Sequence, residues 1–208
     1  AVQDLPASVS TVSSQQMEER GDFEVSGAVT RSVGLSASNT PGNGGLVFSS
    51  RGFMGVNSVG VAEDGLMLGV ASGTVNYPND AWGYERIDVL RGPASIVYGS
   101  GTMGGTVNAV RKQPSRERST DLLVGAGSHG EMRLGFGTTG AINDTLSYRI
   151  DAYGQRRDGE RELGQSNSQK LMTGLRWQPR ADLKVDLTAD IAEQKPERYF
   201  GTPVVDGQ

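Results

Sequence analysis

The stretch ERIDVLRGPASIVYG occupies residues 85–99 of the 208-residue chain. Its first half contains Ile87 to Leu90, which are predicted to form a strand. Pro93 suits the first turn of a helix and Gly99 its end, so one or two helical turns are expected between them. A glycine-rich loop and a second β-favouring segment, Thr106 to Val110, follow. The predicted order is therefore strand, helical turn, glycine loop, strand.

Upstream of this stretch, short helix and strand signals alternate with glycines. Ser13 followed by Gln16 forms a capping box, which predicts the start of a short helix, and Gly21 stands where such a helix would end. Leu46 to Ser50 is predicted to be a strand. The mixed pattern predicts a compact α+β domain over residues 1–114.

After Pro114 the pattern changes to an alternation of apolar and polar residues. In the clearest case, every second residue from Leu183 to Ile191 is apolar and the residues between them are polar or charged. A period of two is typical of a strand with one apolar face. Five segments are predicted to be such strands: residues 122–126, 131–136, 146–153, 170–177 and 183–191.

The apolar face of these strands needs a partner. A soluble β-sandwich would supply a second sheet, and no sheet of matching size is evident in the sequence. In a membrane barrel the apolar face meets lipid and the polar face lines the lumen. Five strands cannot close a plugged transporter barrel, which needs about 22. Residues 115–208 are therefore predicted to be the N-terminal part of a transmembrane β-barrel, and the chain to be part of a longer protein.

The composition argues against several functions. The net charge is −4 and no basic face is evident, so no nucleic-acid partner is expected. Cysteine is absent and His129 is the only histidine, which excludes thiolate and multi-histidine metal sites. His129 is predicted to lie in a hairpin loop. We expect no catalytic residues, no metal site and no cofactor, and hence no enzyme.

The 85–99 stretch resembles the plug signature of TonB-dependent outer-membrane receptors, especially the ferric-siderophore branch. Supporting matches occur in the expected order at residues 50–53, 104–108 and 112–114, which read SRGF, GGTVN and KQP. Asp64-Gly65 falls where the family places its plug hairpin. Residues 139–159 are similar to early barrel strands, so the resemblance covers nearly the whole chain.

The resemblance implies a plug seated inside a barrel in the bacterial outer membrane. It further implies energy-dependent uptake of a ferric siderophore, with the plug as the gate and with iron entering only as the chelate. The implied partners are the siderophore, outer-membrane lipid and the TonB energy-coupling protein. The short segment that engages TonB is not recognisable before Asp4.

Two arginines match positions that lock the plug to the barrel wall in this family. Arg51 and Arg91 each stand at the end of a predicted strand and precede a glycine. A guanidinium there can make several directed bonds to carboxylates. The alternative is an ion pair within the plug, with Glu85 or Asp88 as the partner.

The resemblance places ligand contacts in the loops at the apex of the plug. By register, these loops contain Asn39, Met54, Asn57, Ser58 and Tyr77. Polar and aromatic side chains at these positions could hold a bulky chelate. The alternative is that they are solvated loop residues.

Three other functions compete with the transporter. Residues 99–104 match the G-x-G-x-x-G dinucleotide pattern, but the β-favouring segment after them favours a tight turn in the plug. Two further functions stay open. One is import of another bulky nutrient, such as a cobalamin, a haem or a glycan fragment. The other is a soluble β-rich binding or adhesion module, which extraction without detergent would favour.

Overall fold

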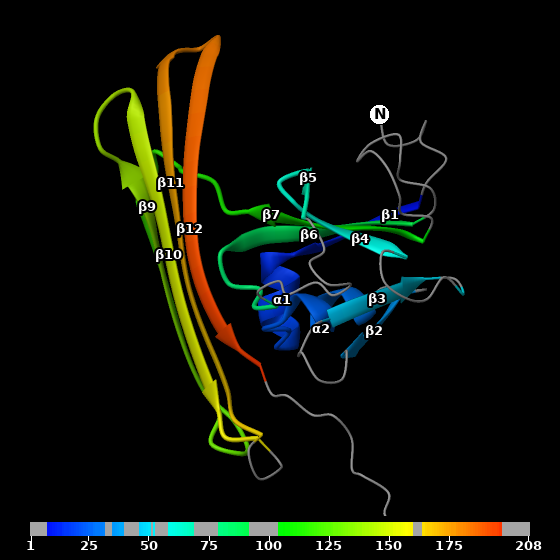
Figure 1. The fold of residues 1–208 in the computed structure, drawn as a ribbon. Coiled ribbons are helices and arrows are strands. Elements are labelled where there is room, and N and C mark those ends of the chain that lie inside the picture. Colours follow the sequence, from blue (N-terminus) through cyan, green and yellow to red (C-terminus); the bar gives the residue numbers. More distant parts are fainter. Residues whose placement is uncertain are drawn as a thin grey trace, which may run out of the picture.

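The computed structural model describes residues 8–31, 35–39, 46–50, 52, 58–68, 79–91, 104–159 and 164–196. These residues form two parts (Figure 1). The first part, called the plug below, contains the described residues from 8 to 111. The second part is a tall, curved sheet over residues 119–195, called the wall sheet below.

The plug combines a mixed sheet with two short helices and a small hairpin. A five-stranded sheet has the order β1-β6-β7-β4-β5, in which only the β4–β7 pair is parallel. Strands β2 and β3 pair separately. The elements are β1 (Ser8–Ser13), α1 (Ser14–Arg20), α2 (Val25–Thr30), β2 (Leu35–Asn39), β3 (Leu46–Ser50), β4 (Val59–Glu63), β5 (Leu66–Met67), β6 (Tyr84–Arg91) and β7 (Gly105–Arg111).

The start and end of α1 confirm the capping signals in the sequence. The Ser13 hydroxyl accepts a hydrogen bond from the Gln16 backbone N–H at 3.2 Å, and the Gln16 side chain accepts one from the Ser13 N–H at 3.1 Å. Gly21 ends the helix with a φ of 68°, a left-handed conformation that favours glycine. Neither helix of the described part has the length and apolar character needed to cross a membrane.

The plug core lies between the helices and the five-stranded sheet. Both helices cover one face of that sheet (Figure 1). The core side chains with the lowest exposure include Val25, Val29, Ile87, Val89 and Val107. The predicted strands at 46–50, 87–90 and 106–110 are confirmed as β3, part of β6 and part of β7. The helical turns predicted after Pro93 lie outside the described residues.

The wall sheet confirms the five predicted strands. All neighbours are antiparallel and the order is β12-β11-β10-β9-β8, so β8 and β12 form the two edges of this sheet. The fold is thus an α+β plug followed by part of an antiparallel barrel. The strands are β8 (Ser119–Ala126), β9 (Met132–Ala141), β10 (Leu146–Arg157), β11 (Ser166–Arg180) and β12 (Leu183–Lys195).

The two faces of the wall sheet differ sharply in polarity. On the inner face of β10, which faces the plug, Ser147, Arg149, Asp151 and Tyr153 are all buried. The outer face carries the exposed large apolar side chains. These are Leu122, Val124, Met132, Leu134, Phe136, Ile150, Leu171, Leu175, Trp177, Val185, Leu187 and Ile191. An apolar outer face and a polar inner face are what a transmembrane barrel strand requires.

The strand connections differ at the two ends of the wall sheet. At one end, residues 142–145 and 181–182 form tight turns, and Asn143 holds the first by accepting hydrogen bonds from the N–H groups of Thr145 and Leu146. At the other end lie residues 127–131, which include His129 as predicted, and the described residues 158–159 and 164–165 that follow β10 and precede β11. Outer-membrane barrels have short periplasmic turns and longer extracellular loops.

Candidate functional site

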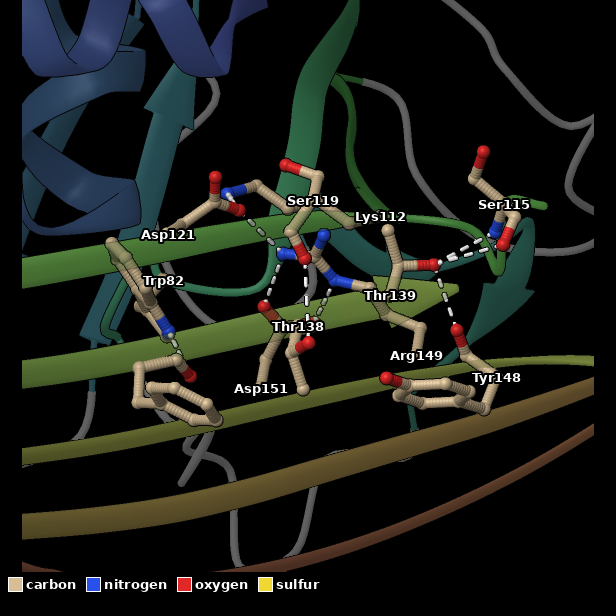
Figure 2. Close-up of polar contacts among 11 residues, drawn as sticks. Trp82, Lys112, Ser115, Ser119, Asp121, Thr138, Thr139, Tyr148, Arg149 and Asp151 are labelled. Carbon is tan, nitrogen blue, oxygen red and sulfur yellow. Dashed lines mark hydrogen bonds and ion pairs between the residues drawn. The ribbon is translucent and has the colours of Figure 1, made fainter. Parts of the chain in front are cut away.

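The candidate site is the interface where the plug meets the inner face of the wall sheet. Trp82, in the segment before β6, reaches this face and donates a hydrogen bond from Nε1 to the Phe136 carbonyl at 3.3 Å (Figure 2). The indole fits because the facing residue on β9 is Gly135. A Cβ at Gly135 would lie 2.9 Å from Trp82 Cε2, too close for any real side chain.

A buried ion pair joins this segment to β11, the fourth wall strand in chain order. Lys170 of β11 places Nζ 2.6 Å from Oδ1 of Asp80, and both side chains are less than 5% exposed, at 4% and 2%. The same Nζ lies 4.4 Å from the centre of the Tyr84 ring, a cation–π contact. Burial raises the pKa of Asp80, and the Lys170 ammonium counteracts part of that rise. Removing one partner of such a pair strongly destabilises a protein, because the other charge stays buried without a counter-charge.

A second charged cluster surrounds Arg111 at the end of β7. Its guanidinium contacts Glu63 of β4, Asp64 of the following turn and Asp190 of β12. The bond to Asp190 Oδ1 measures 2.8 Å and joins the plug to the wall sheet. Burial acts to lower the pKa of Arg111, but Glu63, Asp190 and Asp64 outweigh it and raise that pKa. Arg111 therefore stays charged and bridges three elements.

The segment that leads from β7 to β8 is fixed to the wall sheet along its length. Lys112 lies 3.5 Å from Asp121 of β8. Arg176 of β11 donates hydrogen bonds to the Gln113 side chain at 2.7 Å and to the carbonyl of the next residue at 3.2 Å. The Ser115 N–H donates to the Thr139 hydroxyl of β9 at 2.8 Å (Figure 2).

Arg149 organises the charges on the inner face beside this segment. Figure 2 shows its guanidinium between two carboxylates. It donates to Asp121 of β8 at 2.9 Å and to Asp151 of its own strand at 2.6 and 2.7 Å. Asp121 thus binds both Arg149 and Lys112, so the network spans the wall sheet and the start of the segment that enters it.

Of the two predicted locking arginines, the structure describes Arg91. It ends β6, and its guanidinium donates to the Ser10 hydroxyl of β1. The acids considered as its partners both lie against Arg86, with Arg86 Nε 3.2 Å from Asp88 and Nη1 3.9 Å from Glu85. Arg51 lies outside the described residues. The lock assigned to Arg51 and Arg91 stays a prediction.

The predicted ligand residues are described only in part. Asn39 is the last residue of β2, and Ser58 lies immediately before β4, where its carbonyl accepts a hydrogen bond from the Gly104 N–H at 2.8 Å. Met54, Asn57 and Tyr77 lie outside the described residues. The assignment of these five residues to a ligand site also stays a prediction.

The sequence prediction missed the wall contacts of Asp80, Arg111, Lys170 and Asp190. A partial signal was available for two of them. Lys170 and Asp190 stand at positions that alternate with apolar outer-face residues, so the period of two assigns them to the inner face. Their plug partners carry no such signal, because they stand at least 79 residues away in sequence.

The comparisons with known proteins agree with this architecture. Residues 1–106 match the family described as TonB-dependent Receptor Plug Domain. The chain is 28% identical over 190 residues to the ferrioxamine B receptor of Salmonella typhimurium, covering 89% of this chain and 27% of that protein. It is 26% identical over 213 residues to the ferrichrome outer membrane transporter/phage receptor of Escherichia coli, covering 96% of this chain and 27% of that protein.

Solved structures show the same fold. The pyoverdine outer membrane receptor of Pseudomonas aeruginosa bound to pyoverdine superposes with a TM-score of 0.80 at 22% identity, covering 91% of this chain and 28% of that one. The alcaligin outer membrane receptor of Bordetella pertussis gives a TM-score of 0.77 at 23% identity, covering 92% of this chain and 32% of that one.

The fold and the interface define a plug seated against the first strands of a barrel wall. The chain belongs to the TonB-dependent receptor plug domain family. Members of this family are receptors and transporters rather than enzymes, which confirms that prediction. The chain spans 27 to 28% of the length of the ferrioxamine receptors it matches.

Proposed function

We propose that this chain is the gate and the beginning of the barrel of an outer-membrane receptor that imports a ferric siderophore. In the proposed mechanism, the plug blocks the barrel until the chelate binds at its apex, and the TonB protein then supplies energy for passage. Iron enters as part of the chelate, so the chain itself needs no cofactor. Outer-membrane lipid contacts the apolar outer face of the wall sheet.

The observation that carries this proposal is the placement of charge in the interface. The plug contacts the polar inner face of the wall sheet through Asp80, Arg111 and the segment before β8, while the opposite face of the same strands is apolar and exposed. This arrangement fits a globule held inside a membrane barrel. The relatives named as ferrioxamine and ferrichrome receptors support a siderophore as the cargo.

The proposed site residues complete this account. Asn39, Met54, Asn57, Ser58 and Tyr77 would contact the chelate from the plug apex, and Arg51 with Arg91 would hold the plug to more distant parts of the barrel. A residue range of 1–114 is proposed for the plug and 115–208 for the barrel strands. The end of β7 at Arg111 and the start of β8 at Ser119 support that boundary.

Uptake of radiolabelled iron by cells tests the proposed function. The full-length receptor that contains this chain would be expressed in cells without other siderophore receptors, and ferrioxamine B and ferrichrome would each be supplied. We expect accumulation of iron from at least one chelate, abolished when the coupling protein is deleted or the proton-motive force is collapsed. Uptake that persists without either would contradict gated, energy-dependent import.

The same cells distinguish the alternative cargoes. Binding of haem or cobalamin, with no binding of any ferric siderophore tested, would keep the transport class and replace the cargo. Recovery of the full-length protein from cells without detergent would contradict a membrane receptor altogether.

A further inference from the structure

The segment over residues 79–84, called the bridging segment below, contacts both a plug helix and the wall sheet. At the start of this segment, Asn79 accepts hydrogen bonds from two backbone N–H groups at the N-terminus of α2. Its carbonyl accepts a hydrogen bond from the Val25 N–H at 2.6 Å, and its side-chain oxygen accepts one from the Ser26 N–H at 3.0 Å. The residue that precedes α2, Glu24, makes no side-chain capping bond of its own. Asn79 therefore replaces a local cap from 53 residues away.

Further hydrogen bonds fix Asn79 in this position. Its side-chain nitrogen donates to the Glu24 carboxylate at 2.9 Å and to the Ser26 hydroxyl at 2.8 Å. Two residues later, the Ala81 N–H donates to the Phe23 carbonyl at 2.9 Å. The bridging segment is thus bound along the chain that enters α2.

The other end of the bridging segment is bound to the wall sheet. Asp80 directly follows Asn79 and forms the buried ion pair with Lys170 at 2.6 Å. Trp82 bonds to the Phe136 carbonyl of β9. A Cβ on Gly83 would lie 2.6 Å from the Met172 sulfur, which shows how closely the segment packs on β11. Adjacent residues of one short segment therefore hold α2 and the wall sheet.

We infer that Asn79 and Asp80 act as a mechanical coupling between α2 and strand β11, with Lys170 as the positioning residue on the wall. Displacement of α2 must strain the Asp80–Lys170 ion pair, and loss of the ion pair must loosen the cap of α2. The coupling is distinct from the lock proposed for Arg51 and Arg91. It rests on the proposed function in one respect, namely that the plug loosens from the wall during import.

Hydrogen–deuterium exchange on the full-length receptor tests the coupling without any ligand. Lys170→Met removes the ammonium that pairs with Asp80 while Asp80 stays buried, and it leaves the hydrogen bonds between Asn79 and α2 in place. We expect the amides of residues 25–30 to exchange about 5 to 10 times faster, the factor that loss of a helix cap produces. The matched control is Lys195→Met, which removes a lysine from an exposed ion pair at the end of β12 and should leave α2 unchanged.

Two more variants keep the inference falsifiable if Lys170→Met perturbs the whole plug. In Asp80→Asn/Lys170→Met neither charge remains buried, so exchange in α2 should return toward the wild-type rate. Asn79→Ala should speed exchange in α2, and combining it with Lys170→Met should add little, because both act through one segment.

Three results would overturn the inference. They are wild-type exchange of α2 in Lys170→Met, no recovery in the double variant, or independent, multiplicative effects of Asn79→Ala and Lys170→Met. Failure of iron uptake in those receptor-deficient cells, when they express the unmutated receptor, would refute the proposed siderophore import and leave these exchange results intact, so the two claims fail separately.

Discussion

Glycines make room at the points where the plug approaches the wall sheet most closely. Gly135 faces the Trp82 indole from β9, and Gly83 faces the Met172 side chain of β11. Because neither glycine has a side chain, an aromatic ring and a thioether fill the space between the two parts. Packing at these residues therefore complements the ion pairs in setting where the plug sits.

The fit of Trp82 is tested by Gly135→Ala. The added methyl would lie 2.9 Å from Trp82 Cε2 and 3.1 Å from the Leu123 Cβ, so overpacking should destabilise the seated plug by about 1–3 kcal/mol. We expect a lower urea midpoint for loss of the plug's protease resistance in the detergent-solubilised receptor. Gly154→Ala is the matched control, because nothing lies within 4 Å of a Cβ there. Equal midpoints for the two variants would contradict this packing.

Arg111 links secondary-structure elements that neighbour one another only in the folded protein. Strand β4, the Asp64 turn and wall strand β12 all present carboxylates to it. Without the guanidinium, three acidic side chains would face one another in a partly buried space. Elements of the plug and the wall sheet are thus joined by one cation at this position.

Replacing Arg111 by Met should weaken the contact between β7 and β12. The expected cost is about 1–3 kcal/mol, since the acids lose a charged hydrogen-bond donor while staying partly buried. The urea midpoint for loss of the plug's protease resistance measures this change in stability. Arg180→Met is the control, because Arg180 and Asp182 form an exposed pair of the kind worth about 0–1 kcal/mol. A cost in Arg111→Met no larger than in the control would show that the cluster does not hold the plug.

For the molecule as a whole, the wall sheet separates two environments. Its inner face binds the plug through charged side chains, and its outer face presents apolar side chains to the surroundings. Apolar and polar residues alternate most regularly along β10 and β12. This two-sided pattern is what allows one sheet to contact lipid on one side and a hydrated globule on the other.

Leu187 offers a test of the outer face. It is 66% exposed near the middle of β12, so Leu187→Arg places a charge where lipid is expected. The cost for an arginine at the bilayer midplane is about 2–4 kcal/mol. Folding of the full-length barrel into lipid vesicles, followed by urea titration, should show this loss, whereas Leu187→Ile should behave as wild type. If Leu187→Arg left the stability of the folded barrel unchanged, this face would not meet lipid.

Much of this architecture could be predicted from local pattern. Alternation identified all five wall strands, and the same period of two assigns Arg149 and Asp151 of the 146–153 strand to the polar, inner face. The predicted strand at 131–136 ended too early, since β9 continues to Ala141 through Gly137 and two threonines that carry no apolar signal. A Cβ on Gly137 would lie 2.7 Å from Arg149 Nη2 and from Asp151 Oδ1, so a larger residue there would displace this ion pair.

The contacts between plug and wall sheet could not be predicted in this way. Asp80 and Lys170 are 90 residues apart, and their contact depends on how the plug packs against the wall sheet. Asn79 likewise caps a helix to which no sequence motif connects it. Such contacts follow from the summed packing of the whole interface, whereas periodicity reports only on the faces of single elements.

Single-channel conductance in planar lipid bilayers tests the central claim, that residues 1–114 fill a barrel whose wall begins at residue 115. The full-length receptor should insert and remain closed, and the receptor lacking residues 1–114 should insert and form a large, permanently open pore. Closed channels in both proteins, or an open pore in the intact receptor, would contradict the claim.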